Sequence, residues 1–434
     1  MQKLKFKQTE IGMIPEDWEL KTLKELCLRI YSGGTPNTRD NSLWDGQIPW
    51  LSSGETKQVF VRATNRTISQ KGVDNSSTKL AKKGSTVVAS AGQGHTRGQA
   101  AYLMIDTYIN QSIVVLEPNS SQINKHYLYY LLLSKYDRLR DLSDSHSSRG
   151  SLTCKLLEIV KIALPALIEQ TIISKILTDL DLQIELLQQQ NKTLEKIGKI
   201  IFKQWFVDFE FPNEQGKPYK SSDGKMIESE LGEIPENWRI STVGAELKTI
   251  LGGTPSRVKN EYWENGNISW INSGKVNEFR IINPSELITD IALKKSATKL
   301  MPKRTTVLAI TGATLGQVSL LEIDSCANQS VIGVLESEFL KAEFIFYLIN
   351  DKIEHLISNQ TGGAQQHINK NNVDSLKFIL PDNIALNKYY YIQKELLNKV
   401  TINVFEIESL QKTRDLLLPK LMTGKIRVPM GALK

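Results

Sequence analysis

The chain contains two copies of one long unit, and this internal repeat constrains its fold more than any other feature. Short motifs of the first half return in the second half in the same order. They pair Ile14-Pro-Glu-Asp-Trp18 with Ile234-Pro-Glu-Asn-Trp238, Gly33-Gly-Thr-Pro36 with Gly252-Gly-Thr-Pro255, Ile48-Pro-Trp50 with Ile268-Ser-Trp270, and Asn110-Gln-Ser112 with Asn328-Gln-Ser330. The unit is far longer than a solenoid repeat, so it predicts two domains of one fold related by an approximate two-fold axis.

A run of apolar residues with a period of about 3.5 residues follows each copy. The first run extends from Ile173 to Trp205 and is interrupted at Asn191 and Gly198. The second comprises Leu396, Val400, Asn403, Ile407, Leu410, Arg414, Leu417 and Leu421. This period is typical of a long helix in a coiled coil, and a Leu-Pro pair precedes each run. Because the two helices are equivalent and belong to one chain, we expect them to pair with each other.

Each copy otherwise reads as short strands and turns, followed by a helix. β-Branched runs at Thr86–Ala89 and Ser112–Leu116 predict strands, as do their counterparts in the second copy. Helical spacing of leucines and aromatics predicts helices near 126–138 and 342–355. The predicted class is α+β, with two mixed α/β domains. The expected boundaries are domain 1 at 1–165, helix 1 at 166–206, an exposed linker at 207–230, domain 2 at 231–381, helix 2 at 382–424 and a tail at 425–434.

The composition is ordinary for a globular protein, with 40% hydrophobic and 23% charged residues. Cys27, Cys154 and Cys326 lie far apart, so neither a disulfide framework nor a zinc site is indicated, which suits a reducing cytosol. The N-terminus lacks the apolar core of a secretory signal, and no run reaches the roughly 18 apolar residues of a membrane span. We therefore expect a cytoplasmic protein. A net charge of +7 is a mild indication of a polyanionic partner.

The sequence offers little catalytic chemistry. No P-loop motif is present, and the five histidines are scattered without metal-ligand spacing. The Asn/Asp-Pro-Pro-aromatic motif of amino-methyltransferases is also absent. Gly92–Gly98 is either a phosphate-cradling loop or a hairpin loop, and its spacing favours the hairpin. Glu19-Leu-Lys21 has nuclease-like spacing, but the second copy does not reproduce it. These observations predict a chain without catalytic or metal-binding residues.

The ordered set of motifs resembles the specificity (S) subunits of type I restriction–modification systems. The resemblance rests on the Ile-Pro-Glu-x-Trp, Gly-Gly-Thr-Pro and tryptophan segments, on Phe206-Val-Asp-Phe-Glu-Phe-Pro212, and on Leu418-Pro-Lys-Leu-Met-Thr-Gly-Lys-Ile426. It covers essentially the whole chain. It implies two target-recognition domains joined by two long antiparallel helices, in a host-defence complex that binds double-stranded DNA. It also implies two modification (methyltransferase) subunits docked on the helices and restriction (translocase–nuclease) subunits. S-adenosylmethionine, ATP and Mg would belong to those partners.

The expected geometry fits this resemblance. A helix of about 40 residues spans about 60 Å, long enough to separate two half-sites about one DNA turn apart. Since the copies diverge in sequence, the predicted target is bipartite and asymmetric, with an unread spacer set by the helices. In an antiparallel pair, Asn191 and Asn403 would face each other and could fix the helix register, because a buried Asn pair sacrifices stability for register. Two exposed or water-bound asparagines are the alternative.

Comparing the copies sorts residues by role. Residues identical in both copies cannot read two different sequences, so Gly33, Gly34, Pro36, Trp50 and Asn110 are predicted scaffold; adenine readout is the alternative for Asn110-Gln111 and Asn328-Gln329. Candidate base readers are polar residues of divergent loops. They are Gln93, His95, Thr96, Arg97, Ser147, Ser148 and Arg149 in the first copy, and Lys275, Asn277, Arg280, Gln365, Gln366 and His367 in the second. Arg97 and Arg149 suit guanine, and Gln365 and Gln366 suit adenine. Solvated loop polarity is the alternative for each.

Several lysines suit a different role. Lys79, Lys82, Lys83, Lys299 and Lys303 would contact phosphate or simply face water. Two rival functions remain open. One is a stand-alone DNA methyltransferase or endonuclease with an unrecognised active site, and the other is a scaffold without sequence readout.

Overall fold

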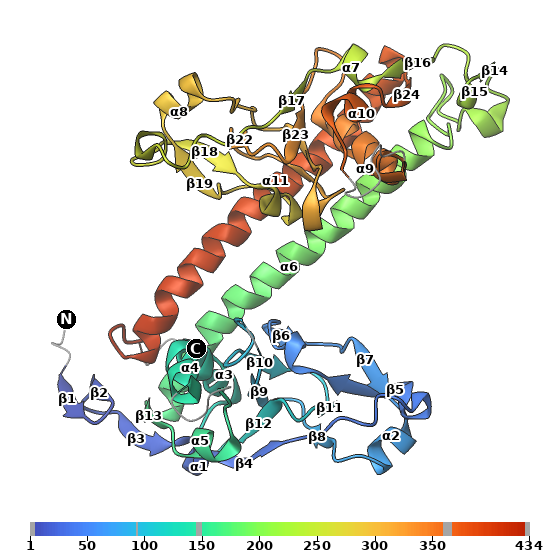
Figure 1. The fold of residues 1–434 in the computed structure, drawn as a ribbon. Helices are drawn as coiled ribbons and strands as arrows, with labels where there is room; N and C mark the ends of the chain where they lie inside the picture. Colours follow the sequence, from blue (N-terminus) through green and yellow to red (C-terminus); the bar gives the residue numbers. More distant parts are fainter. Residues whose placement is uncertain (1–4, 93, 145–149, 359–366, 430–434) are drawn as a thin grey trace. The chain divides into compact units, whose positions relative to one another are not determined.

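The computed structural model describes residues 5–92, 94–144, 150–358 and 367–429 (Figure 1). Its contacts divide the chain into unit 1, Met1–Glu185 with Ser409–Lys434, and unit 2, Leu186–Glu408. Both boundaries fall inside long helices. Each unit therefore contains one globular domain and a stretch of each helix.

Unit 1 is built on two sheets. The first has the strand order β4 (Cys27–Ser32), β12 (Ile113–Pro118), β9 (Thr86–Ala89), β10 (Ala100–Leu103) and β6 (Phe60–Val61). The second has the order β7 (Arg66–Ile68), β5 (Trp44–Leu51), β11 (Thr107–Ile109) and β8 (Lys79–Ala81). Strands β9 and β12 are apolar and mostly buried along their length, as expected for central strands of a sheet.

Unit 2 repeats this topology. Its first sheet runs β17 (Thr249–Leu251), β23 (Val331–Val334), β20 (Thr306–Ala309) and β21 (Val318–Leu320). Its second runs β19 (Glu286–Ile288), β18 (Ile268–Ile271) and β22 (Cys326–Ala327). Single bridges, Ile281 to Leu321 and Met301 to Ser325, stand where unit 1 has β6 and β8. The repeat found in the sequence is thus a repeat of fold.

Helices cover the sheets in each unit. In unit 1 the helix predicted at 126–138 is two helices, α3 (Lys125–Ser134) and α4 (Tyr136–Asp144), and Asn124 caps α3 by accepting from two backbone N–H groups. In unit 2 it is one helix, α9 (Ala342–Ser358). Short helices are α1 (Leu23–Leu26), α2 (Gln70–Asp74), α5 (Cys154–Glu158), α7 (Val243–Glu246), α8 (Asp290–Lys295) and α10 (Lys370–Asp374).

Paired strands at the domain edges complete each unit. Unit 1 has the pairs β1 (Phe6–Thr9) with β2 (Gly12–Pro15) and β3 (Glu19–Thr22) with β13 (Lys161–Leu164). Unit 2 has β14 (Met226–Ser229) with β15 (Gly232–Pro235) and β16 (Arg239–Thr242) with β24 (Lys377–Leu380). Single turns of 3-10 helix are η1 (Asn41–Leu43), η2 (Ser53–Glu55), η3 (Lys220–Ser222), η4 (Asn260–Tyr262), η5 (Ser273–Asn277) and η6 (Gly312–Thr314).

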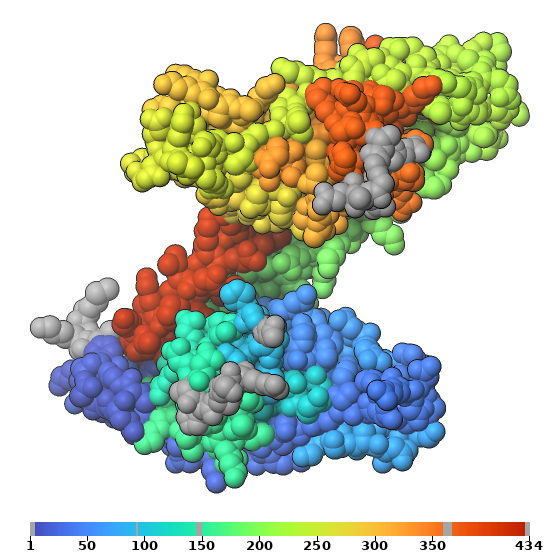
Figure 2. All heavy atoms as spheres, viewed as in Figure 1, coloured from blue at the N-terminus to red at the C-terminus, as the bar shows by residue number. Residues whose placement is uncertain are grey.

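The two long helices are α6 (Leu167–Phe206) and α11 (Asn383–Met422), each of 40 residues. Their observed ends lie within two residues of the predicted ones. In unit 1, Leu177 of α6 shares a core with Leu421 of α11, and in unit 2, Trp205 of α6 shares a core with Tyr389 of α11. The start of one helix therefore packs on the end of the other, which is antiparallel pairing. Parts of both helices remain visible at the surface in Figure 2, α6 in green and α11 in red.

The segments after the long helices are more ordered than a linker and a tail. Phe211 is buried and stacks on Trp238, with ring centroids 4.7 Å apart. After α11, Arg427 forms ion pairs with Asp17 and Glu169 at 2.7 Å each and lies over the equivalent Trp18. The prediction of an exposed linker from residue 207 is therefore wrong for its first residues. Their aromatic side chains pack against the tryptophan of the Ile-Pro-Glu-x-Trp motif.

None of the helices that the model describes is both long and apolar enough to cross a membrane.

Candidate nucleic-acid interface

The tryptophan shared by both copies is fixed by a glycine of the Gly-Gly-Thr-Pro turn. The indole N–H of Trp50 donates to the carbonyl oxygen of Gly34 at 3.4 Å, and that of Trp270 donates to Gly253 at 3.3 Å. A Cβ at Gly34 would lie 2.8 Å from the carbonyl carbon of Ser77, too close for a side chain. These shared residues bind one another, as expected of scaffold.

The Asn-Gln pair of each copy also holds a turn. The side-chain oxygen of Asn110 accepts the backbone N–H of Ser112 at 3.0 Å, and Asn328 makes the same bond in unit 2 at 3.1 Å. Gln111 accepts a hydrogen bond from the threonine of the Gly-Gly-Thr-Pro turn, and unit 2 repeats this contact. Because these side-chain oxygens accept hydrogen bonds from the protein's own turns, the geometry favours scaffold, although Gln111 and Gln329 are exposed and adenine readout by them stays an alternative.

The Gly92–Gly98 segment is a hairpin loop. The backbone N–H of Gly98 donates to the carbonyl oxygen of Ala89 at 2.9 Å and closes the turn between β9 and β10. Gly316 makes the equivalent bond in unit 2. Glycines 92, 94 and 98 have positive φ, which explains the glycine content without a bound nucleotide. Within this loop His95 is exposed and Thr96 is half-buried, while Gln93 lies outside the described residues.

Arg97 does not project toward solvent as a base reader would. Its side chain is buried and forms an ion pair with Asp144 at the end of α4. A Cβ at Gly150 would collide with its guanidinium, so Arg97 packs directly against this glycine. Its pairing with Asp144 occupies one of its donors and does not favour guanine readout, which stays a prediction for Arg97.

Five of the other predicted readers cannot be placed. Ser147, Ser148, Arg149, Gln365 and Gln366 lie outside the described residues. His367 is described and exposed. Its loop leads into α10, whose N-cap is Asn369. For all six, base reading stays a prediction.

Two predicted readers of unit 2 lie on η5. Asn277 is exposed at its last residue. Lys275 is half-buried and forms an ion pair with Glu278 at 2.7 Å. The turn begins at Asn272, whose side chain accepts the backbone N–H of Lys275 and so fixes this loop. Asn277 is accordingly better placed than Lys275 to contact a base.

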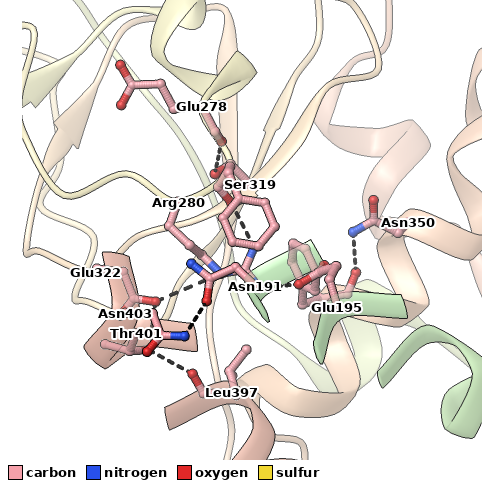
Figure 3. A network of polar contacts seen from close by, with 12 residues as sticks. Asn191, Glu195, Glu278, Arg280, Ser319, Glu322, Asn350, Leu397, Thr401 and Asn403 are labelled. Carbon is pink, nitrogen blue, oxygen red and sulfur yellow. Dashed lines mark hydrogen bonds and ion pairs between the residues drawn. The ribbon is translucent and has the colours of Figure 1, made fainter. Parts of the chain in front are cut away.

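Arg280 attaches the domain to a long helix instead of facing DNA. Its side chain is only 1% exposed and pairs with Glu195 of α6 at 2.7 Å (Figure 3). It is held between the rings of Phe279 and Phe346, 4.5 and 4.6 Å from their centroids. Because the Arg280 side chain is buried and paired with Glu195, this arrangement does not favour contact with a base, and base reading by Arg280 stays a prediction.

Behind Arg280 lies a buried carboxylate. Glu322 is 3.9 Å from the Arg280 guanidinium and accepts a hydrogen bond from Thr401 of α11 at 3.0 Å (Figure 3). Burial raises the pKa of Glu322 above its usual range, and the contacts with Thr401 and Arg280 oppose that rise. This network ties the second domain to both helices of its unit.

Unit 1 attaches its domain with an arginine from another position. Arg62, next to β6, forms two parallel hydrogen bonds with Glu185 of α6, at 2.7 and 2.8 Å. The Arg62 side chain is far more exposed than that of Arg280, while the two glutamates are equally exposed. Sequence reasoning missed Arg62, Glu185 and Glu195. The available signal was that Glu185 and Glu195 are charged residues on a predicted long helix.

Asn191 and Asn403 lie face to face in unit 2, as the seam predicted. Both are buried, at 3% and 0% exposure, and the Asn403 amide donates to the Asn191 side-chain oxygen at 2.9 Å (Figure 3). Among the described residues, no donor forms a hydrogen bond with the side-chain oxygen of Asn403. The contact is observed; that it fixes register remains a proposal.

A charged contact occupies the equivalent seam in unit 1. Arg414 of α11 pairs with the buried Asp181 of α6 at 2.7 Å, and the Tyr130 hydroxyl of α3 donates to the same carboxylate at 2.7 Å. Burial and the neighbouring Asp181 raise the pKa of Tyr130, so its hydroxyl stays protonated as a donor. Asp181 escaped the sequence analysis because it stands one residue beside the apolar seam.

A basic groove of 910 Å³ opens on unit 1. Its charged lining residues are Lys24, Arg29, Lys79, Lys82 and Glu158, and Cys27 lies among them. Burial raises the pKa of the Cys27 thiol to about 12, so this cysteine stays protonated and is no nucleophile. Lys79 and Lys82 are exposed, as are Lys83, Lys299 and Lys303, which leaves phosphate contact by these lysines as a prediction.

No cluster of three or more His, Cys, Asp or Glu side chains suited to a metal occurs in the part of the chain that the model describes.

Comparisons with known proteins agree with the fold. The family model described as type I restriction modification DNA specificity domain matches residues 15–196 and again 235–413. The specificity subunit of the type I restriction enzyme MjaIX of Methanocaldococcus jannaschii is 28% identical over 98% of this chain and 96% of its own length. The HindI specificity subunit of Haemophilus influenzae is 24% identical, covering 80% and 88%. The crystal structure of an S subunit from M. genitalium matches with a TM-score of 0.59 at 16% identity, covering 93% and 96%.

Proposed function

Because this chain belongs to the type I restriction modification DNA specificity family, we propose that it reads an asymmetric bipartite DNA site, with one half-site per unit. Partner subunits would methylate adenine at that site or restrict unmodified DNA. Family membership disfavours the alternative of a stand-alone methyltransferase or endonuclease. The chain is a non-catalytic specificity subunit.

The duplicated domain with divergent loops is the observation that carries this proposal. The two units share strand order and the Trp–Gly turn, yet their hairpin loops differ in length and in side chains. A shared frame with different loops suits two readers of different sequences. The long antiparallel helices, which belong to both units, would set the length of the unread spacer between the half-sites.

Exposed apolar side chains on the long helices support docking of two identical partners. On α6 they include Ile168, Leu186 and Ile200, with exposures of 42%, 48% and 46%. The repeat-equivalent residues of α11 are also exposed: Ile384 at 70%, Ile402 at 58% and Leu416 at 63%. Their spacings of 18 and 14 residues correspond to about five and four turns, so each set lies on one helical face. Two equivalent stripes fit two modification subunits; restriction subunits would join that assembly.

Substitutions on these stripes test the partner proposal. Leu186→Lys and Ile402→Lys would each weaken one docking site, because a charge would be buried at the contact. We expect the mass of the purified complex with modification subunits to fall by one subunit for each single variant and by two for the double variant. Gln188→Lys, an exposed change two residues from Leu186, is the matched control. Retention of both partners by the double variant would contradict the proposal.

We propose that S-adenosylmethionine, ATP and Mg are ligands of the partner subunits. We propose that the complex acts on genomic DNA in the cytoplasm.

Mapping methylated adenines in the genome of a host carrying the complete system tests the central proposal. We expect one asymmetric bipartite motif with a constant spacer, lost when this chain is deleted. Equal binding of the chain to all duplexes across a salt series would instead favour a scaffold without sequence readout.

A further inference from the structure

In both units an arginine lies over the ring of an equivalent tryptophan. In unit 1 the Arg66 guanidinium lies 3.6 Å from the ring centroid of Trp44, and in unit 2 Arg257 lies 3.6 Å from that of Trp263. Each of these tryptophans packs edge-on against the shared scaffold tryptophan, at 5.0 Å in unit 1 and 5.3 Å in unit 2. The cation therefore occupies the same slot in both copies.

The two arginines reach that slot from different strands. Arg66 lies on β7 opposite Trp50 in the strand register. The equivalent position on β19, opposite Trp270, is Glu286. Arg257 instead follows the Gly-Gly-Thr-Pro turn. The arginine therefore comes from a different position in each unit, while its place over the tryptophan ring is the same.

The charges of the two arginines differ in their compensation. Arg257 forms two hydrogen bonds with Glu286, at 2.6 and 2.7 Å, so its fork of donors is occupied. This contact holds the pKa of Glu286 below its usual range. Arg66 is exposed, and no carboxylate among the described residues pairs with it. The charge on unit 1 is thus available to a ligand, and the charge on unit 2 is not.

The backbone at Arg66 is also held firmly. The Thr64 hydroxyl accepts the backbone N–H of Trp50 at 3.3 Å and donates to the carbonyl oxygen of Arg66 at 2.8 Å. The buried Glu55 carboxylate accepts the N–H of Asn65 at 2.8 Å. With its backbone fixed and its plane stacked on an indole, the guanidinium loses little entropy when its edge binds an anion.

We propose that Arg66 is a DNA phosphate-binding residue of unit 1, and that Arg257, neutralised by Glu286, makes no such contact in unit 2. This inference rests on the proposed DNA-reading function. A guanidinium edge matches a phosphate with two parallel hydrogen bonds. The two units therefore contribute unequally to the salt-dependent part of DNA binding, and unit 1 binds the DNA phosphates more strongly.

Salt dependence of binding by the full chain tests this inference. The probes are a duplex carrying the site mapped by methylation and a scrambled duplex of equal length. For Arg66→Ala, the negative slope of log K against log salt should become shallower by about 0.9 on both duplexes, because one phosphate contact is lost. An unchanged slope would overturn the inference. A loss confined to the mapped site would also overturn it, since that result indicates a base contact.

Glu286→Ala provides a test that poor folding cannot imitate. Removing this carboxylate frees Arg257 in the slot where Arg66 acts, so the negative slope should become steeper by about 0.9. The double variant Arg257→Ala with Glu286→Ala keeps the net charge and should bind as the wild type does. If Glu286→Ala left the slope unchanged, a free cation in this slot would not meet DNA, and the inference would fail. If the wild-type chain showed no preference for the mapped site, the proposed function itself would fail.

Discussion

Units 1 and 2 keep the same strand order and the same Trp–Gly contact, yet they join their domains to α6 through different arginines. In unit 1 the Arg62 side chain that pairs with Glu185 is 43% exposed, whereas in unit 2 the Arg280 side chain that pairs with Glu195 is 1% exposed and lies over two aromatic rings. Apolar and glycine-dependent contacts thus persist between the copies, while charged contacts are rebuilt at new positions. The comparison indicates that packing preserves the reader fold and that polar side chains are free to specialise.

Removing a shared tryptophan should have the largest effect, and it should be confined to one copy. Trp50→Ala would leave a cavity beside Gly34 and cost about 3–5 kcal/mol of stability. Trp270→Ala should cost a similar amount in unit 2. Methylation mapping at a permissive temperature should show Trp50→Ala relaxing one half-site and Trp270→Ala the other. Loss of both half-sites in either variant would break the picture of two separate readers.

The two arginine anchors should differ strongly in their contribution to stability. Arg280→Met leaves the buried Glu322 without its cation, which should cost about 3–5 kcal/mol. Arg62→Met removes a partly exposed pair and should cost at most about 1 kcal/mol. Denaturant unfolding of the two variants measures both values. Equal losses would show that burial does not distinguish the anchors.

The buried asparagine pair should respond differently to single and double substitution. Asn403→Leu leaves Asn191 buried without its partner and should cost about 1–3 kcal/mol. Replacing both with leucine should restore stability or raise it, but relax the register. Unfolding curves test the first expectation, and methylation mapping tests the second by showing a mixture of spacer lengths. A constant spacer in the double variant would remove the pair from the account of register.

Glu322 should produce a small pH effect in unit 2. Its folded pKa is raised above the reference value of 4.5, so this residue favours the folded state when protonated and loses that contribution as pH rises through the folded pKa. Glu322→Gln lacks this titration. It should therefore gain stability relative to the wild type as pH rises from below 4.5 to neutrality. Parallel unfolding curves across this range would contradict the prediction.

The apolar period of the long helices and the internal repeat predicted most of the fold. Both patterns reflect the packing of apolar residues and can be read directly from the sequence. The ends of α6 and α11 and the facing of Asn191 and Asn403 follow directly from the 3.5-residue seam. The roles of Arg97 and Arg280 did not follow, since an arginine in a divergent loop looks the same whether it faces solvent or a carboxylate distant in sequence. The partners of both arginines, Asp144 and Glu195, come together only through the tertiary fold.

The central claim is that the paired helices set the distance between two independent readers. Inserting one turn of four residues into α6 and one into α11, at opposing positions, should lengthen the pair by about 6 Å. Genome methylation in a host carrying this variant should show both half-sites unchanged and a spacer about two base pairs longer. An unchanged spacer, or altered half-sites, would contradict the account.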